Sequence, residues 1–193
     1  MKGWAKVSYT QDEDAVLVAL LRDGFGRVRD GVSALLEGAD DQLLRYRPST
    51  HANHIGWLIW HLSRVQDDHF VHLARALWPR DNFEQRWVAE GVARRFGLPY
   101  PVGDTGYGHD ADQVAAFGMF DGGFLMDYHE MTHDYCHTIL GRLEISDFQT
   151  IIDHRWNPPV STAVRLVSVL EDVTKHLGQA EYIAGLYAAR SLS

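Results

Sequence analysis

The sequence predicts an all-α protein, a four-helix bundle with an elaborated connection between the second and third helices. Four stretches carry apolar residues at helical spacing and are long enough to be bundle helices. Prolines and glycines gather between these stretches, where they interrupt regular structure. No repeat, low-complexity tract or linker divides the 193 residues, a length that suits one compact core. We therefore expect a single domain over residues 1–193.

The first two predicted helices form the first half of the bundle. The first runs from Asp12 to Leu36, although Gly24 and Gly31 weaken its helical propensity. The second runs from about Asn53 to Leu77. It is expected to stop there because Pro79 disfavours helical geometry in the residue before it.

The chain between the second and third helices is predicted to be long and irregular. A short helix is expected near residues 83–96, followed by a loop over 97–110 that contains two prolines and four glycines. The third helix is predicted over Ala111 to Leu143, with internal glycines that are able to bend it. The fourth runs from Ser161 to Arg190, and Ser161 is a suitable N-cap.

Composition excludes several classes of partner. The formal net charge of −8 argues against nucleic acid, because binding phosphates requires clustered Lys and Arg. No apolar run approaches the roughly 20 residues that cross a membrane, so no membrane partner is expected. The N-terminus lacks the apolar region of a signal peptide. A single cysteine, Cys136, cannot form an internal disulfide, and together these features predict a cytoplasmic protein.

Two distant segments carry candidate metal ligands. Asp172 and His176 stand four residues apart on the fourth helix, so their Cβ atoms lie roughly 5–6 Å apart on one face. His61, on the second helix, is a candidate third ligand. Three protein ligands leave room for water or substrate, as in catalytic sites. The alternatives are a solvated polar face for Asp172 and His176 and a buried core position for His61.

The fourth helix has a polar stripe around these candidates. Its members are Arg165, Ser168, Asp172, His176 and Gln179. We expect Gln179 to hydrogen-bond a metal ligand or the substrate. Arg165 is expected to bind a substrate carboxylate or to form an internal salt bridge, with Asp68 as the candidate partner.

The third helix contains a rival motif. His129-Glu130-Met-Thr-His133 matches H-E-x-x-H, in which two histidines bind zinc and the glutamate acts as base. The longer form of the protease motif is absent, because Cys136 stands where its glycine is required. The segment is therefore interpreted as a polar face of a bundle helix, with a zinc protease as the third hypothesis for function.

Two motifs together carry a family resemblance. The run Ile55-Gly-Trp-Leu-Ile-Trp-His-Leu62, with Asp172-x-x-x-His-x-Gly-Gln179 far downstream, resembles the DinB/YfiT-like superfamily. It is most similar to actinobacterial members related to the mycothiol-dependent maleylpyruvate isomerase N-terminal domain. The segment Gly106-Tyr-Gly-His109 is similar to the loop before the third helix in that group.

The resemblance implies a four-helix bundle with one divalent metal held by His61, Asp172 and His176. Many members have histidine where this chain has Asp172, a difference that bears on which metal is bound. Two histidines and a carboxylate suit zinc or nickel, and also manganese or ferrous iron.

Two classes of function follow. The first is a metal-dependent S-transferase or isomerase acting on a small thiol, such as mycothiol, and a small electrophile. In this reading Trp57 contacts the substrate, the loop from Gly103 to His109 covers the site, and His109 shuttles a proton. The second is a non-catalytic protein of the stress response that binds a metal or ligand. A homodimer is also expected.

Overall fold

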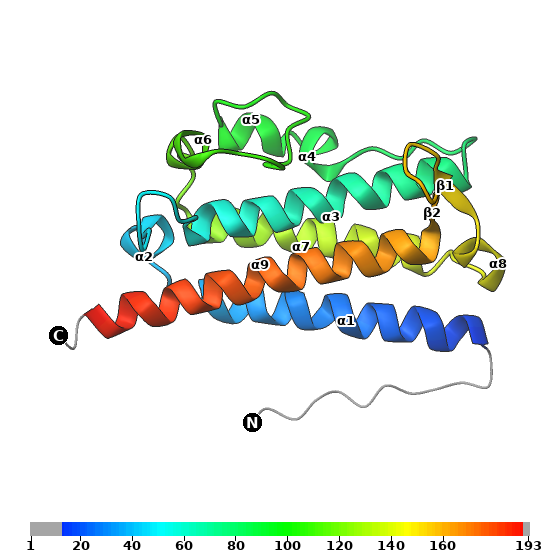
Figure 1. The fold of residues 1–193 in the computed structure, drawn as a ribbon, viewed down its shortest axis with the longest axis horizontal. Helices are drawn as coiled ribbons and strands as arrows, with labels where there is room; N and C mark the ends of the chain where they lie inside the picture. The colour runs from blue at the N-terminus through cyan, green and yellow to red at the C-terminus, as the bar shows by residue number, and fades with distance from the viewer. Residues whose placement is uncertain (1–12, 191–193) are drawn as a thin grey trace.

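The computed structural model describes residues 13–190, and these residues form an all-α bundle (Figure 1). The four long helices are α1 (Glu13–Leu36), α3 (Ile55–Leu77), α7 (Gly122–Leu140) and α9 (Thr162–Arg190). This confirms the expected fold class. Asp12 and the N-terminus on which the signal-peptide prediction rests lie outside the described residues. None of the described helices combines the length and apolar character needed to cross a membrane.

The four long helices form a square in cross-section. Helices α1 and α3 each pack against both α7 and α9, so α1 and α3 face one another across the core. Phe25 of α1 and Phe70 of α3 meet there edge to face, with ring centroids 5.2 Å apart. Removal of such apolar side chains from water supplies most of the free energy that stabilises the packing of bundle helices.

The glycines of α1 allow close approach of α9. A Cβ atom on Gly24 would lie 2.8 Å from Leu170 of α9, and one on Gly31 would lie 2.5 Å from Leu177. Real Cβ atoms do not approach other atoms so closely, so a larger residue at either position would force the leucine side chain of α9 to move. The residues that weaken the helical propensity of α1 are thus the residues that let α9 pack against it.

Short elements fill the connections between the long helices. They are α2 (Asp41–Arg45), α4 (Arg86–Ala89), α5 (Val92–Phe96), α6 (Ala111–Ala115), α8 (Ile145–Phe148), β1 (Ile151–Asp153) and β2 (Val160–Ser161). The connection from α3 to α7 contains α4, α5 and α6, and it lies along α3 in Figure 1. The two strands pair antiparallel, Ile151 with Ser161 and Asp153 with Val160.

The prediction of one continuous third helix is wrong. The chain leaves helical geometry after α6 and re-enters it at α7, whose N-terminus is capped by Asp121 through a hydrogen bond from Phe124 N. Phe117, within the break, is buried against the rings of His54 and Trp60. Packing of this aromatic side chain holds the chain against the core at the break, which also contains Gly118.

The other boundaries differ less from the predictions. The short helix expected near residues 83–96 is two helices, α4 and α5, separated by Gly91 with φ of +67°. Residues 97–110 contain no helix or strand, as expected for that loop. Ser161 Oγ accepts a hydrogen bond from Val164 N at 3.4 Å, which is the geometry of the predicted N-cap.

A buried ion pair on α3 holds the connection in place. Arg64 and Asp67 are fully buried, and Arg64 Nη1 lies 3.5 Å from Asp67 Oδ2. Asp67 accepts hydrogen bonds from the backbone N–H groups of Arg86 and Trp87 at the start of α4, and from the hydroxyl of Tyr128 on α7. One carboxylate therefore joins α3, α4 and α7.

A second buried polar group, His54, begins α3. Its Nδ1 accepts a hydrogen bond from Trp57 N at 3.0 Å, and its Nε2 donates to the carbonyl oxygen of Val114 at 3.1 Å. This pattern requires a neutral ring. Burial lowers the pKa of His54 to about 4, although the hydrogen bond to Val114 opposes that shift.

The first prediction is a loss of stability in acid that depends on His54. Above pH 6.5 the ring is neutral in both the folded and unfolded chain. Below it, the unfolded chain takes up a proton that the folded chain resists until about pH 4. The unfolding free energy should therefore fall by about 1.4 kcal/mol per pH unit for this group. Urea denaturation of metal-free protein between pH 6.5 and 4.5 measures the slope.

Replacement of His54 by Asn keeps an N-cap side chain without a group that titrates in this range. The unfolding free energy of His54→Asn should therefore change less steeply with pH than that of the parent. The difference in slope should be about 1.4 kcal/mol per pH unit, which corresponds to one proton. The same change at His51, whose side chain is exposed, serves as the control. If His54→Asn and the parent have equal slopes, the neutral-histidine cap is refuted.

Candidate metal centre

One cluster of potential metal ligands is found in the described part of the chain. It consists of His61, Asp172 and His176, whose ligand atoms all lie within 4.8 Å of one another. The imidazole rings of His61 and His176 are 4.6 Å apart at a nearly perpendicular angle. Helices α3 and α9, which pack against each other in the bundle, bring these residues together.

His61 is oriented by a backbone carbonyl. Its Nδ1 lies 2.5 Å from the carbonyl oxygen of Thr105. Because a carbonyl only accepts, Nδ1 carries the hydrogen and Nε2 keeps its lone pair. Burial lowers the pKa of His61 to about 4, so the ring is neutral at neutral pH. A neutral imidazole whose other nitrogen donates to a carbonyl is the usual form of a metal ligand.

His176 is oriented by Gln179, one turn further along α9. The Oε1 atom of Gln179 lies 3.0 Å from Nδ1 of His176, which leaves Nε2 facing Asp172 at 3.6 Å. Burial lowers the pKa of His176, but hydrogen bonds to Asp172 and Gln179 outweigh burial and raise it overall. A bound cation would replace the proton shared by this pair.

Asp172 supplies the carboxylate of the cluster. Its Oδ2 atom is buried and has no hydrogen-bond partner among the described residues. A buried carboxylate oxygen without a partner is costly unless a proton or a cation satisfies it. The donor set of two imidazole nitrogens and one carboxylate oxygen therefore fits a divalent transition-metal ion.

A tight loop covers His61 on the side away from α9. Gly106, with φ of +88°, lies so close that a Cβ atom there would be 2.9 Å from His61 Nδ1 and 2.9 Å from Trp57. Asp104 fixes this turn by accepting a hydrogen bond from Gly106 N at 2.8 Å. Only glycine combines this backbone angle with such close contact to the ring.

Trp57 supports a ligand instead of contacting the open side of the site. Its indole is buried and stacks on the imidazole of His61, with centroids 4.7 Å apart and planes 12° apart. Its Nε1 donates to Nδ1 of His109 at 3.2 Å. This placement differs from the substrate contact expected from the sequence, because Trp57 lies behind His61 in the bundle wall.

His109 is also placed differently from the expectation of a mobile, proton-shuttling residue. Its side chain is only 2% exposed. Nδ1 accepts from Trp57, and Nε2 donates to Asp104 Oδ2 at 3.0 Å. Both nitrogens are engaged, so the geometry gives His109 a role in holding the loop and does not support proton transfer.

Arg165 pairs with a carboxylate other than the expected Asp68. Its Nη2 lies 3.0 Å from Asp153 Oδ2, and its Nη1 lies 3.4 Å from Nδ1 of His69. Asp153 belongs to β1, and the sequence had suggested no partner there. A cavity of about 360 Å³ is lined by Arg165 and by the candidate ligands His61 and Asp172.

The H-E-x-x-H segment of α7 does not form a comparable site. His129 is fully buried, its Nδ1 is hydrogen-bonded to Ser63 Oγ at 3.0 Å, and burial lowers its pKa to about 3. Glu130 is exposed on another face of the helix. His129 and His133 do not belong to the ligand cluster of the described residues, so the zinc-protease hypothesis finds no support.

Several residues of the site lie outside the motifs found in the sequence. Thr105 fixes His61 through its backbone carbonyl, which no side-chain pattern reveals. Asp153 ends β1 and Arg155 lies in the connection to β2, and the position of these residues beside α3 depends on tertiary packing. For Thr105, the only signal in the sequence was its position in the glycine-rich loop that contains Gly106.

Comparisons with known proteins address the fold and the family. The family model of the DinB superfamily matches residues 25–180. A solved structure, described as the conserved protein of locus from Enterococcus faecalis, has the same fold with a TM-score of 0.75 and 24% sequence identity. The alignment covers 86% of this chain and 93% of that one. No curated protein matches the chain significantly. The chain belongs to the DinB superfamily.

Proposed function

We propose that this chain is a metal-dependent enzyme that transfers a small thiol to a small electrophile, or isomerises an electrophile with the help of the thiol. The observation that carries the proposal is the His61–Asp172–His176 cluster, which adjoins a cavity lined by His61 and Asp172. A structural metal site is normally closed by four protein ligands, whereas a catalytic site keeps one position open. Three ligands beside a cavity match the catalytic type.

The metal is proposed to be zinc or nickel, with manganese or ferrous iron as the other candidates. When bound, a divalent cation lowers the pKa of a thiol that binds it and so supplies a nucleophile at neutral pH. The protein contributes the fixed ligands and the packed, water-excluding side chains behind them. Trp57 stacks on His61, and Gly106 closes the loop against the same ring, so water reaches the ligands from the cavity side.

The reacting thiol is proposed to come from a small molecule. Cys136 is fully buried, and burial raises its pKa well above the ordinary value. Such a thiol is inert as a nucleophile. Mycothiol is the proposed thiol, following the resemblance of the loop and helix motifs. A cytoplasmic location, where small thiols stay reduced, and a homodimer belong to the same proposal.

The second prediction tests the ligands. His176→Ala should weaken binding of zinc or nickel by at least about 100-fold, since losing a direct ligand costs more than losing an outer partner. His133→Ala, on the rival motif of α7, should leave affinity unchanged. Competition titration against a chromophoric chelator measures both, with circular dichroism to verify folding. Loss of metal in His133→Ala with retention in His176→Ala would favour the α7 site.

The third prediction tests the loop that orients His61. Gly106→Ala should lower metal affinity by about 10–100-fold, because the new Cβ displaces the ring or the Thr105 carbonyl. Gly108→Ala is the matched control. It also has a positive φ, +77°, but a Cβ there meets no atom within 4 Å, so it shares the backbone strain without touching His61. Equal affinities of the two variants would contradict this role of Gly106.

The fourth prediction concerns the thiol itself. Metal-loaded protein should bind mycothiol in isothermal titration, and metal-free protein should not, because the cation is proposed to hold the sulfur. Turnover of small electrophiles such as maleylpyruvate is then measured with both forms and with His176→Ala. A metal-loaded protein that binds no thiol would refute the transferase and leave a non-catalytic metal-binding protein. Thiol binding without turnover would point to the same conclusion.

A further inference from the structure

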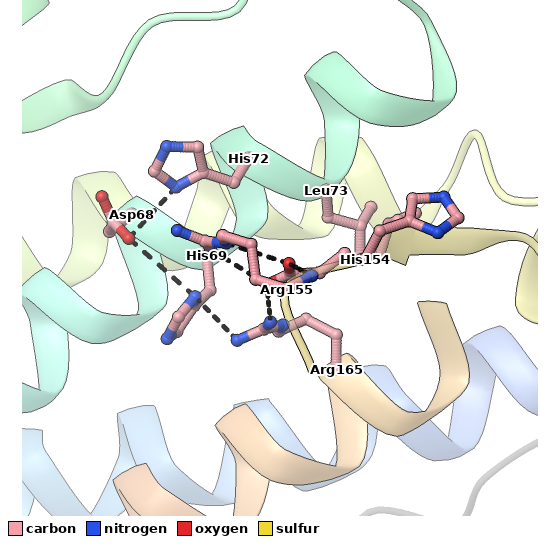
Figure 2. Close-up of a pocket in the computed structure, with 9 residues that line it drawn as sticks. Asp68, His69, His72, Leu73, His154, Arg155 and Arg165 are labelled. Carbon is pink, nitrogen blue, oxygen red and sulfur yellow. Dashed lines mark hydrogen bonds and ion pairs between the residues drawn. The ribbon is translucent and has the colours of Figure 1, made fainter. Parts of the chain in front are cut away.

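The cavity beside the ligand cluster has two chemically different ends. Its lining includes His61 and Asp172 together with Arg155 and Arg165. Arg165 stands two turns before Asp172 on α9, about 10 Å along the helix axis, so the arginines and the candidate ligands lie toward different ends. A neighbouring cavity of about 410 Å³ shares both arginines with it, along with Asp68 and His69 (Figure 2). The arginines therefore face open space from two sides.

The arginine end carries an excess of positive charge. Asp153 Oδ2 lies 2.9 Å from Arg155 Nη2 and 3.0 Å from Arg165 Nη2, so one carboxylate is shared by two guanidinium groups. Arg155 Nε also donates to Asp153 Oδ1 at 3.0 Å. Two cations and one anion leave a net charge of +1 on this group of three residues.

The remaining donors are available to a ligand. The Arg155 side chain is 86% exposed although Asp153 fixes its orientation. Its Nη1 has no hydrogen-bond partner among the described residues, and Figure 2 shows the side chains of Arg155 and Arg165 close together. A guanidinium held in place by one carboxylate loses little further freedom when it binds a second anion.

Acidic groups along the cavity are themselves paired. Asp68 accepts hydrogen bonds from His72 Nδ1 at 3.1 Å and from Gln85 Nε2 at 2.7 Å. Asp172 belongs to the proposed metal site, where a divalent cation more than offsets its charge. Asp68 remains charged, so the two arginines are balanced by Asp68 and Asp153. A divalent cation beside Asp172 would bring the whole cavity lining to a net charge of +1, which attracts an anion.

Two exposed aromatic side chains line the same cavity. Tyr107 is 90% exposed and Trp156 is 60% exposed. Tyr107 comes from the loop that contains Gly106, and Trp156 lies next to Arg155 between β1 and β2. Large aromatic side chains left in solvent beside a cavity offer apolar surface to a ligand.

We propose that this cavity binds a small organic anion, a carboxylate or a phosphate attached to an apolar or aromatic group. The anionic group pairs with Arg155 and Arg165, and the apolar part packs on Trp156 and Tyr107. The inference rests on the proposed function where it names this molecule as the electrophilic substrate of the metal site. Binding to the arginine end does not require turnover.

The test uses phenylacetate, its neutral isostere phenylacetamide, and phenyl phosphate as probes in isothermal titration. Metal-loaded and metal-free protein are titrated separately, with the metal content measured. Phenylacetate should bind at least about tenfold more tightly than phenylacetamide, a difference of about 1.4 kcal/mol. Comparison of phenylacetate with phenyl phosphate shows which anion is preferred. Affinity for the anions should be higher in the metal-loaded form.

Variants separate the arginine end from the metal. Arg155→Leu should weaken phenylacetate binding about tenfold in both forms and reduce the preference over the amide by the same factor. Arg94→Leu is the matched control, since Arg94 lines a different cavity near Trp87. Trp156→Ala should weaken acid and amide equally. Because Arg155 is largely exposed, its replacement leaves the core intact.

Three results would overturn the anion site: equal affinity for acid and amide, equal effects of Arg155→Leu and Arg94→Leu, or no binding of any probe by either form. The second result, combined with loss of binding in metal-free protein, would mean that the anion binds the metal alone. A protein that binds no metal but still shows Arg155-dependent anion binding would refute the proposed enzyme while keeping this site.

Discussion

The buried ion pair of Arg64 and Asp67 is the interaction on which the functional part of the molecule depends. Two charges without solvent are stable only when every polar atom around them is satisfied, and leaving one unpaired costs about 3–5 kcal/mol. Here Asp67 receives the first N–H groups of α4 and the hydroxyl of Tyr128. Arg64 Nε donates to the carbonyl of Asp104 at 3.1 Å. The pair thereby fixes the connection between α3 and α7 against the bundle.

This anchoring reaches the candidate ligand His61 through a short chain of contacts. Asp104, held at its carbonyl by Arg64, uses its carboxylate to fix the turn at Gly106 and the ring of His109. The next residue, Thr105, then presents its carbonyl to Nδ1 of His61. Because that hydrogen bond decides which nitrogen of His61 is free, the connection determines whether the ring is ready to bind a metal. His176 is oriented independently, by Gln179 on its own helix.

The difference between these two ligands explains how much could be predicted from the sequence. Helical spacing placed Asp172, His176 and Gln179 on one face, since that relation is local to a helix. The pairing of α3 with α9 required only the bundle fold, which brings His61 to the same place. The break before α7 and the partner of Arg165 followed from tertiary packing of Phe117 and Asp153. The side chain of His109, predicted to shuttle a proton, is buried for the same reason.

The residues around the site therefore differ in how firmly the fold holds them. The three candidate ligands stand on α3 and α9, whose positions are set by the core. Arg155 and Trp156 project from the turn between β1 and β2 and are mostly exposed. A substitution there alters what the cavity attracts at little cost to the fold. In the proposed function, the bundle would fix where a metal is held, and the connection between β1 and β2 would select the molecule that reaches it.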